Sequence, residues 1–216
     1  MAELLEIYDL QSTLIGMQDR KEFYKEIKQE FREQGQITRK VKTIRLLLMN
    51  SAGRVYIQKR SKIKEENSGM YDKTVGGHIV AGDSSNMTVV KECAEELWFP
   101  AVVTTEQEFL TSTRVVNLEV IGVFRLLEYV QNFISERKSV DWKRMFQPLM
   151  NTFYCGYYDW AIKFRDGEAS GVEVLSVQEL KEEMQSYPER FTEDLRFMIE
   201  KYEKYLVPIS ELSSLW

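Results

Sequence analysis

Residues 77–99 read GHIVAGDSSNMTVVKECAEELWF, and this segment decides which fold we predict. Its first half is a loop bracketed by glycines, at Gly76, Gly77 and Gly82. Glycine has no Cβ and tolerates unusual φ angles, so such a loop lets the backbone come close to a ligand. The second half, NMTVVKECAEELW, is apolar at every fourth position, which predicts a helix over residues 86–98.

Three glutamates lie on this predicted helix. Glu92, Glu95 and Glu96 stand at positions i, i+3 and i+4, so their carboxylates share one face of an α-helix. In isolation, this spacing is more often a solvated acidic face than a binding site. After a glycine loop it favours a site for Mg²⁺ and a diphosphate, because Mg²⁺ prefers oxygen ligands and commonly bridges carboxylates to substrate phosphates. Such an ion also lowers the pKa of an attacking water.

The segment resembles the Nudix box, G-x5-E-x7-R-E-U-x-E-E-x-G-U, in which U is a bulky aliphatic residue. Gly77, Glu92, Glu95 and Glu96 fall in register across its whole span. A looser resemblance extends over residues 38–205. The stretches GMYDKTVGGHIVAGD and YPERFTEDL make it closest to the Nudix branch that resembles isopentenyl-diphosphate isomerase.

Four positions depart from the Nudix box. Asp83 replaces a glutamate and keeps a carboxylate, while Cys93 replaces an aliphatic residue and packs as a small hydrophobe. Lys91 replaces an arginine that orients a catalytic glutamate in the family, and lysine keeps the charge but loses the bidentate geometry. Trp98 replaces the terminal glycine, so we expect the turn after the helix to differ.

The resemblance implies an α/β fold, or α+β given the irregular order of strands and helices. The architecture that the resemblance implies is an α/β/α sandwich, in which helices flank a mixed sheet. The resemblance also implies a metal-dependent hydrolase that cleaves the diphosphate link of a nucleoside diphosphate joined to another moiety, or of a similar organic diphosphate. Glu92, Glu95 and Glu96 would bind Mg²⁺ or Mn²⁺, or one of them would instead act as base on the water. Lys91 would assist them.

Residues near the glycine loop are candidates for binding the substrate phosphates. Gly76 and Gly77 offer a close approach of the backbone. Arg45 and Arg60 lie on or after the strands that flank the loop, where guanidinium groups can pair with phosphate. Exposed charges at a strand edge explain the two arginines equally well. His78 is more typical of a hydrogen-bonded loop residue than of a metal ligand.

Two alternatives to hydrolysis follow from the departures. A Nudix-fold module that binds a ligand or a protein without turnover is motivated by Asp83, Lys91 and Trp98, although all three glutamates remain. Isomerase activity is disfavoured, because Gly76 stands where the resembling isomerase has its active-site cysteine. That enzyme also holds its metal with several histidines, whereas this chain has only His78. Metal-dependent release of a monophosphate from nucleoside diphosphate compounds discriminates hydrolase from binder.

The rest of the chain predicts two parts, an N-terminal appendage over residues 1–36 and a Nudix domain over residues 37–216. The appendage combines a hairpin of residues 4–8 and 12–17 with an amphipathic helix from Asp19 to Gly35. Strands in the domain are expected at 38–49, 55–58, 113–128, 151–160 and 172–177. Helices are expected from Val177 and after Pro188, and the stretch 131–148 as an inserted helix or lid.

Composition narrows the setting. The 216 residues carry a net charge of -5, which provides no basic field to gather polymeric nucleic acid. No run approaches the ~20 apolar residues of a membrane span, and the N-terminus lacks a signal-peptide pattern. Cys93 and Cys155 lie in apolar surroundings, which favours two buried thiols over a disulfide. We therefore expect a cytoplasmic protein that acts on a small organic diphosphate away from membranes, and a homodimer formed through the appendage.

Overall fold

The computed structural model describes residues 3–139, 143–164, 167 and 169–215. Residues 1–2, 140–142, 165–166, 168 and 216 lie outside this description. They include the outer ends of both predicted domain ranges and the middle of the stretch 131–148.

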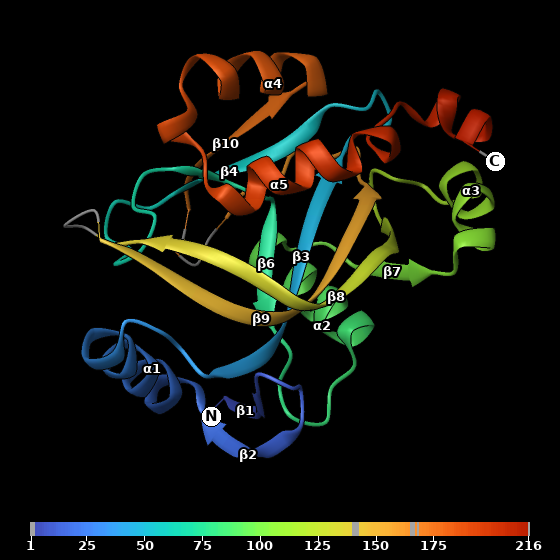
Figure 1. The fold of residues 1–216 in the computed structure, drawn as a ribbon. Coiled ribbons are helices and arrows are strands. Elements are labelled where there is room, and N and C mark those ends of the chain that lie inside the picture. Colours follow the sequence, from blue (N-terminus) through green and yellow to red (C-terminus); the bar gives the residue numbers. More distant parts are fainter. Residues whose placement is uncertain (1–2, 140–142, 165–166, 168, 216) are drawn as a thin grey trace.

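A mixed sheet forms the centre of the molecule (Figure 1). From one edge to the other, the main strands are β10 (Ala169–Leu175), β4 (Val55–Arg60), β3 (Arg39–Met49), β9 (Arg144–Tyr157), β8 (Gly122–Lys138) and β7 (Ala101–Thr104). The central pair, β3 and β9, is parallel, as is the edge pair β8 and β7, while β9 and β8 are antiparallel. The short strands β5 (Tyr71–Asp72) and β6 (Val75–His78) pair with β4 and β3, respectively.

Side chains of β3 alternate between two apolar clusters on opposite faces of the sheet. Leu46 and Leu48 belong to the cluster that packs under α2 (Ser85–Glu92). Leu47 and Met49 belong to the other cluster, because successive residues of a strand point to opposite faces. That cluster includes the buried apolar residues of α3 (Glu106–Val115), α4 (Val177–Ser186) and α5 (Glu193–Tyr202). The predicted arrangement of helices on both faces of a mixed sheet is confirmed.

The N-terminal segment adds to this sheet through β1 (Leu4–Asp9), which pairs with β3 and with β2 (Leu14–Asp19). Helix α1 (Arg20–Gln34) follows, and Asp19 caps it by accepting hydrogen bonds from two backbone N–H groups of its first turn. Gly35 ends α1 in the left-handed conformation. The predicted hairpin and helix are confirmed, and the boundary at residues 36 and 37 stays a prediction.

The expectation of an inserted helix or lid over 131–148 is wrong for the described residues. They belong to the long antiparallel strands β8 and β9. Phe133 and Ser135 are buried while Asn132 and Ile134 are exposed, which is the two-residue period of a strand. This alternation, interrupted by charged residues, is the signal that the sequence interpretation overlooked.

The strand expected over 113–128 begins too early. Residues up to Val115 belong to α3, which starts at a capping box formed by Thr105 and Glu108, and β8 begins only at Gly122. The other predicted strands and helices are found at shifted bounds. In the described C-terminal part of the chain, 3₁₀ segments lie at Pro188–Arg190, Glu203–Tyr205 and Ile209–Leu215.

Two further expectations concern the whole chain. Cys93 and Cys155 are both buried free thiols, as predicted. Within the described residues, none of the helices is long and apolar enough to cross a membrane.

Candidate functional site

The helix that carries the glutamates changes its winding directly after the first of them, Glu92. It begins at Ser84, whose hydroxyl accepts a hydrogen bond from the backbone N–H of Met87, and it is α-helical up to Glu92. Residues Cys93–Leu97 then form a π-helical turn, in place of the α-helix expected over residues 86–98. Such wide turns occur frequently at functional sites. Glu95 and Glu96 therefore lie on this turn and not on a regular α-helical face.

Glu92 packs directly against Gly77, which together with Gly76 lies on the strand β6 and not in the loop expected from the sequence. An ideal Cβ built on Gly77, which is buried in β6, would lie 1.9 Å from Oε1 and 2.5 Å from Cδ of Glu92. A side chain at position 77 would therefore displace the carboxyl group of Glu92. The two halves of the segment of residues 77–99 are therefore in contact through Gly77 and Glu92.

The three carboxyl groups influence one another. Burial and the charge of Glu95 raise the pKa of Glu92 to about 7, while a hydrogen bond with the side chain of Glu96 works in the opposite direction. A hydrogen bond between two carboxyl groups needs a proton on one of them. The raised pKa means that the ionised form of Glu92 is disfavoured beside Glu95, as expected of a place that receives a cation.

Within the described residues, no three acidic, histidine or cysteine side chains form a ready-made metal cage. Glu96 lines a cavity, Glu92 lies against Gly77, and Glu95 is exposed. Carboxylate oxygens nevertheless suit Mg²⁺, which is usually held by one or two protein carboxylates together with substrate phosphates and water. The donor set fits an ion that arrives with its substrate better than one held by the protein alone.

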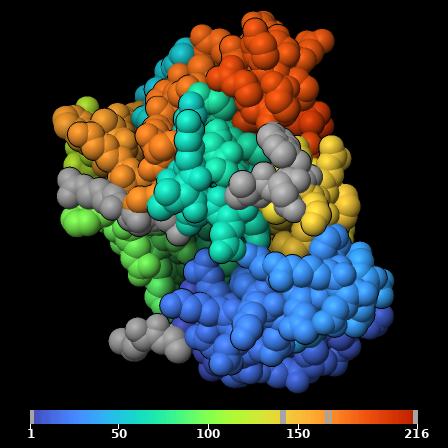
Figure 2. All heavy atoms as spheres, turned by 90° about the vertical axis from the view of Figure 1, so that its left-hand side faces the viewer, coloured from blue at the N-terminus to red at the C-terminus, as the bar shows by residue number. Residues whose placement is uncertain are grey.

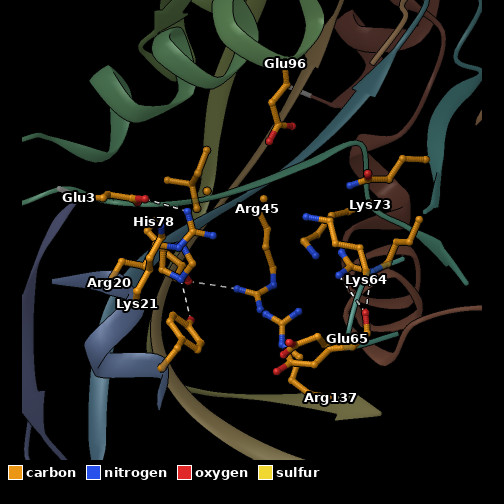
Figure 3. A pocket seen from close by; sticks show the side chains of 18 of the residues that line it. Glu3, Arg20, Lys21, Arg45, Lys64, Glu65, Lys73, His78, Glu96 and Arg137 are labelled. Atoms are coloured by element: carbon orange, nitrogen blue, oxygen red, sulfur yellow. Dashed lines mark hydrogen bonds and ion pairs between the residues drawn. The ribbon is translucent and has the colours of Figure 1, made fainter. Parts of the chain in front are cut away.

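A cavity of about 760 Å³ opens beside Glu96. One wall comes from the appendage, with Arg20, Lys21 and Tyr24 of α1, and the opposite wall from β3, β4 and β6. Figure 2 shows the appendage in blue, directly below the teal segment that follows β4. Figure 3 shows Glu96 at one end of this cavity and Arg137 at the other. The cavity has the size of a small-molecule site.

Comparison with known proteins agrees with this geometry. Residues 39–195 match the NUDIX domain family, which is most of the chain. The chain belongs to the Nudix domain family. No curated protein matches its sequence.

Solved structures show the same fold. The protein DR0079 from Deinococcus radiodurans is similar with a TM-score of 0.59 and 18% identity, over 92% of this chain and 98% of that one. A MutT protein from Methanosarcina mazei has a TM-score of 0.46 and 15% identity, over 76% of this chain and 93% of that one. At 18% identity, the likeness to DR0079 shows the fold alone, with helices on a mixed sheet.

The four residues predicted to bind substrate all line the cavity beside Glu96. They are Gly76, Gly77, Arg45 and Arg60. Arg45 is nevertheless only 2% exposed. Its Nε and Nη2 donate to Oδ2 of Asp194 at 2.9 and 2.7 Å. Its Nη1 donates to the side chains of Thr43 and Asn151. Arg45 therefore ties β3 to α5, and its contact with substrate stays a prediction.

Arg60 is held in a similar way. Its Nη1 lies 3.2 Å from Oδ2 of Asp72, and its Nη2 donates to the backbone carbonyl of Glu66 at 3.0 Å. Asp72 also accepts hydrogen bonds from Lys73 and from Thr192. Binding of phosphate by Arg60 likewise stays a prediction, and its present contacts brace the cavity wall.

Two departures from the Nudix box meet in space. Nζ of Lys91 lies 2.6 Å from Oδ2 of Asp83, across the turn that precedes the helix. This ammonium group is about half exposed and is committed to Asp83 rather than to a glutamate of the trio. The catalytic role assigned to Lys91 stays a prediction.

Trp98 adopts φ 63° and ψ 33°, the left-handed conformation that glycine reaches most easily. We expected the turn after the Nudix helix to differ from a glycine turn. The expectation is wrong, because the tryptophan is accommodated in the glycine conformation and its side chain is 64% exposed.

The sequence interpretation missed a polar floor of the cavity. Nε2 of His78 lies 2.6 Å from the hydroxyl of Tyr24, which also accepts a hydrogen bond from Gln147. Burial and the nearby Arg20 hold the pKa of His78 well below its usual value, so the ring is neutral. The predicted hydrogen-bonding role of His78 is confirmed, on β6 rather than in a loop. Arg137 reaches the same floor from β8, and no motif in the sequence marks it.

Proposed function

We propose that this Nudix protein is a metal-dependent hydrolase that cleaves the diphosphate link of a small organic diphosphate, such as a nucleoside diphosphate joined to another moiety. The observation that carries the proposal is the contact between Gly77 and Glu92 at the edge of a cavity that Glu96 lines. Carboxylates and a side-chain-free backbone are thereby brought to one place.

In this proposal Glu92, Glu95 and Glu96 hold Mg²⁺ or Mn²⁺ together with the substrate phosphates. The bound ion would offset the charge of the diphosphate and lower the pKa of the attacking water. Glu96, which reaches the cavity, is proposed as the base that receives the proton from this water. Gly76 and Gly77 let the diphosphate approach the backbone of β6.

The test is release of a phosphorylated product from a panel of nucleoside diphosphate compounds, with Mg²⁺, with Mn²⁺ and with EDTA. Turnover should need the metal, and Glu96→Gln should reduce kcat/KM by about 100-fold or more, since a positioned base contributes 10²–10⁴-fold. The melting temperature should stay near that of the wild type. Glu119→Gln, an exposed acid outside the cavity, is the control and should keep full activity. Wild-type turnover by Glu96→Gln contradicts the site assignment.

A non-catalytic binding module is the second candidate, and the pairing of Lys91 with Asp83 favours it, because the family's helper position is engaged elsewhere. The same panel separates the two functions. Absence of turnover on every compound, together with binding of one of them, supports the module. A metal requirement for turnover supports the hydrolase.

We also propose a cytoplasmic homodimer and a place in the branch that resembles isopentenyl-diphosphate isomerase, without isomerase activity. Leu14, Ile15 and Met17 of the appendage strand β2 are each at least half exposed, which supports burial against a second copy. Sedimentation velocity of the wild type and of Ile15→Ser tests the dimer. A wild-type chain that sediments as a monomer removes this part of the proposal.

A further inference from the structure

Four cationic side chains line the cavity on the side away from Glu96. Arg45 comes from β3, Arg60 from β4, Lys73 from the segment before β6, and Arg137 from β8. In Figure 3, Arg45, Lys73 and Arg137 lie below Glu96. They come from segments far apart in the sequence, so no single motif accounts for their assembly.

Three of these cations share two buried carboxylates. Arg45 binds Asp194 at 2.7 Å, and Arg60 binds Asp72 at 3.2 Å. Lys73 lies between the two acids, 3.0 Å from Asp72 and 3.6 Å from Asp194. Both acids are at most 2% exposed. These three cations already outnumber the two acids, so the group holds one positive charge in excess.

Arg137 raises the excess to two positive charges, four cations against two acids. Within the described chain, no carboxylate lies within 4.0 Å of its guanidinium, and its buried Nε has no hydrogen-bond partner. Two more acids line the cavity near it, Glu65 and Glu66, and both bind Lys28, at 2.8 and 3.0 Å. Lys64 lines the same cavity, so Lys28 and Lys64 balance these two acids and the excess of two remains. Because the cations of this wall outnumber its acids, an anion in this part of the cavity would be attracted to it and would stabilise the wall.

We propose that this wall is a second anion subsite that binds a phosphate monoester carried by the substrate at a distance from the diphosphate that is cleaved. A phosphate monoester carries a charge of about -1.5 to -2 near neutral pH, which matches the excess of two. The fork of Arg137 is suited to bidentate binding of phosphate. This inference rests on the proposed function, because it places the diphosphate beside Glu96, and it narrows the substrate class to phosphorylated organic diphosphates.

Binding is measured by calorimetry in EDTA, so that hydrolysis does not enter. The probes are two matched pairs that differ by one phosphate monoester, NADP⁺ with NAD⁺ and coenzyme A with 3′-dephospho-coenzyme A. The wild type should bind the phosphorylated member of at least one pair about tenfold or more tightly, as expected of a charge-assisted contact. Arg137→Gln should remove this preference by weakening only that member. Arg144→Gln, an exposed arginine of the same hairpin outside the cavity, should keep it.

Three results overturn the subsite. They are no preference in either pair, a preference that survives Arg137→Gln, and an equal loss for both members, which would place Arg137 on the shared diphosphate. A structural role is excluded by the melting temperature in phosphate-free buffer. Arg137→Gln should stay near the wild type there, because the guanidinium forms no ion pair within 4.0 Å with a described carboxylate, and a marked decrease contradicts the proposal. Since no readout uses turnover, a failed hydrolase assay leaves this test standing.

Discussion

The carboxyl group of Glu92 lies in the space that a side chain at Gly77 would occupy. A Cβ there would stand 1.9 Å from Oε1, far inside van der Waals contact. The glycine of the box and its first helical glutamate are thus in direct contact. The glycine keeps the acid in place at the edge of the cavity, so its role is spatial as well as conformational.

Gly77→Ala should therefore displace Glu92. We expect kcat/KM to fall by about 100-fold or more, on the scale of losing a positioned acid–base group. Overpacking at a buried site should also lower the free energy of unfolding by about 1–3 kcal/mol. The control is Gly171→Ala in β10, where a Cβ meets nothing within 4 Å and which should change neither quantity. Steady-state kinetics and denaturant unfolding measure both. Full activity of Gly77→Ala would show that the position of Glu92 is irrelevant to turnover.

The features that the sequence predicted are local ones. The spacing along one helix and the glycines next to it predict Glu92, Glu96 and Gly77 as candidate site residues, because all three lie within one short segment. Capping by Asp19 and termination by Gly35 are equally local, and both ends of α1 were predicted correctly. The π-helical turn was not predicted, since the same residue pattern is compatible with an α-helix.

The cavity wall was out of reach for a different reason. Arg45 and Asp194 are separated by 149 positions, and their ion pair exists only after β3 and α5 have packed together. Arg137 lies on a hairpin that was interpreted as a helix or lid, so its side chain had no predicted neighbours. Long-range pairing of charges leaves no periodic signal in one sequence.

Trp98 offers a measurement of backbone strain. A left-handed conformation costs a residue with a Cβ about 1–2 kcal/mol relative to glycine. We expect Trp98→Gly to be more stable than Trp98→Ala by about 1 kcal/mol, because both variants lose the indole and only the glycine relieves the backbone. Chemical denaturation of the two variants measures this difference. If alanine equals or exceeds glycine, the strain at φ 63° is absent in solution.

The Lys91–Asp83 pair predicts a small effect for a residue assigned to catalysis by position. Lys91→Gln should lower kcat/KM by less than about tenfold, because its ammonium group is bound to Asp83 and not to the glutamates. The free energy of unfolding should fall by about 0.2–1 kcal/mol, the range measured for exposed ion pairs. Glu96→Gln, measured in parallel, is the comparison. A loss with Lys91→Gln as large as that of Glu96→Gln would instead establish Lys91 as part of the catalytic machinery.

The buried pair of Arg45 and Asp194 predicts how stability depends on pH. Burial alone would raise the pKa of Asp194, but Arg45 and then Lys73 outweigh it and hold that pKa below the ordinary value of 3.8. The unfolded chain then binds the proton more readily, so the contribution of Asp194 is fully present above about pH 4 and is lost as the pH falls through its lowered pKa.

Asp194→Asn removes this contribution and leaves Arg45 unpaired, which should cost about 3–5 kcal/mol at pH 7. The difference in unfolding free energy between wild type and variant should shrink as the pH falls from 5 to about 2. Glu119→Gln, an exposed acid, should show a small difference throughout. A gap for Asp194→Asn that is constant across this range would mean that the carboxyl group is not ionised in the folded protein.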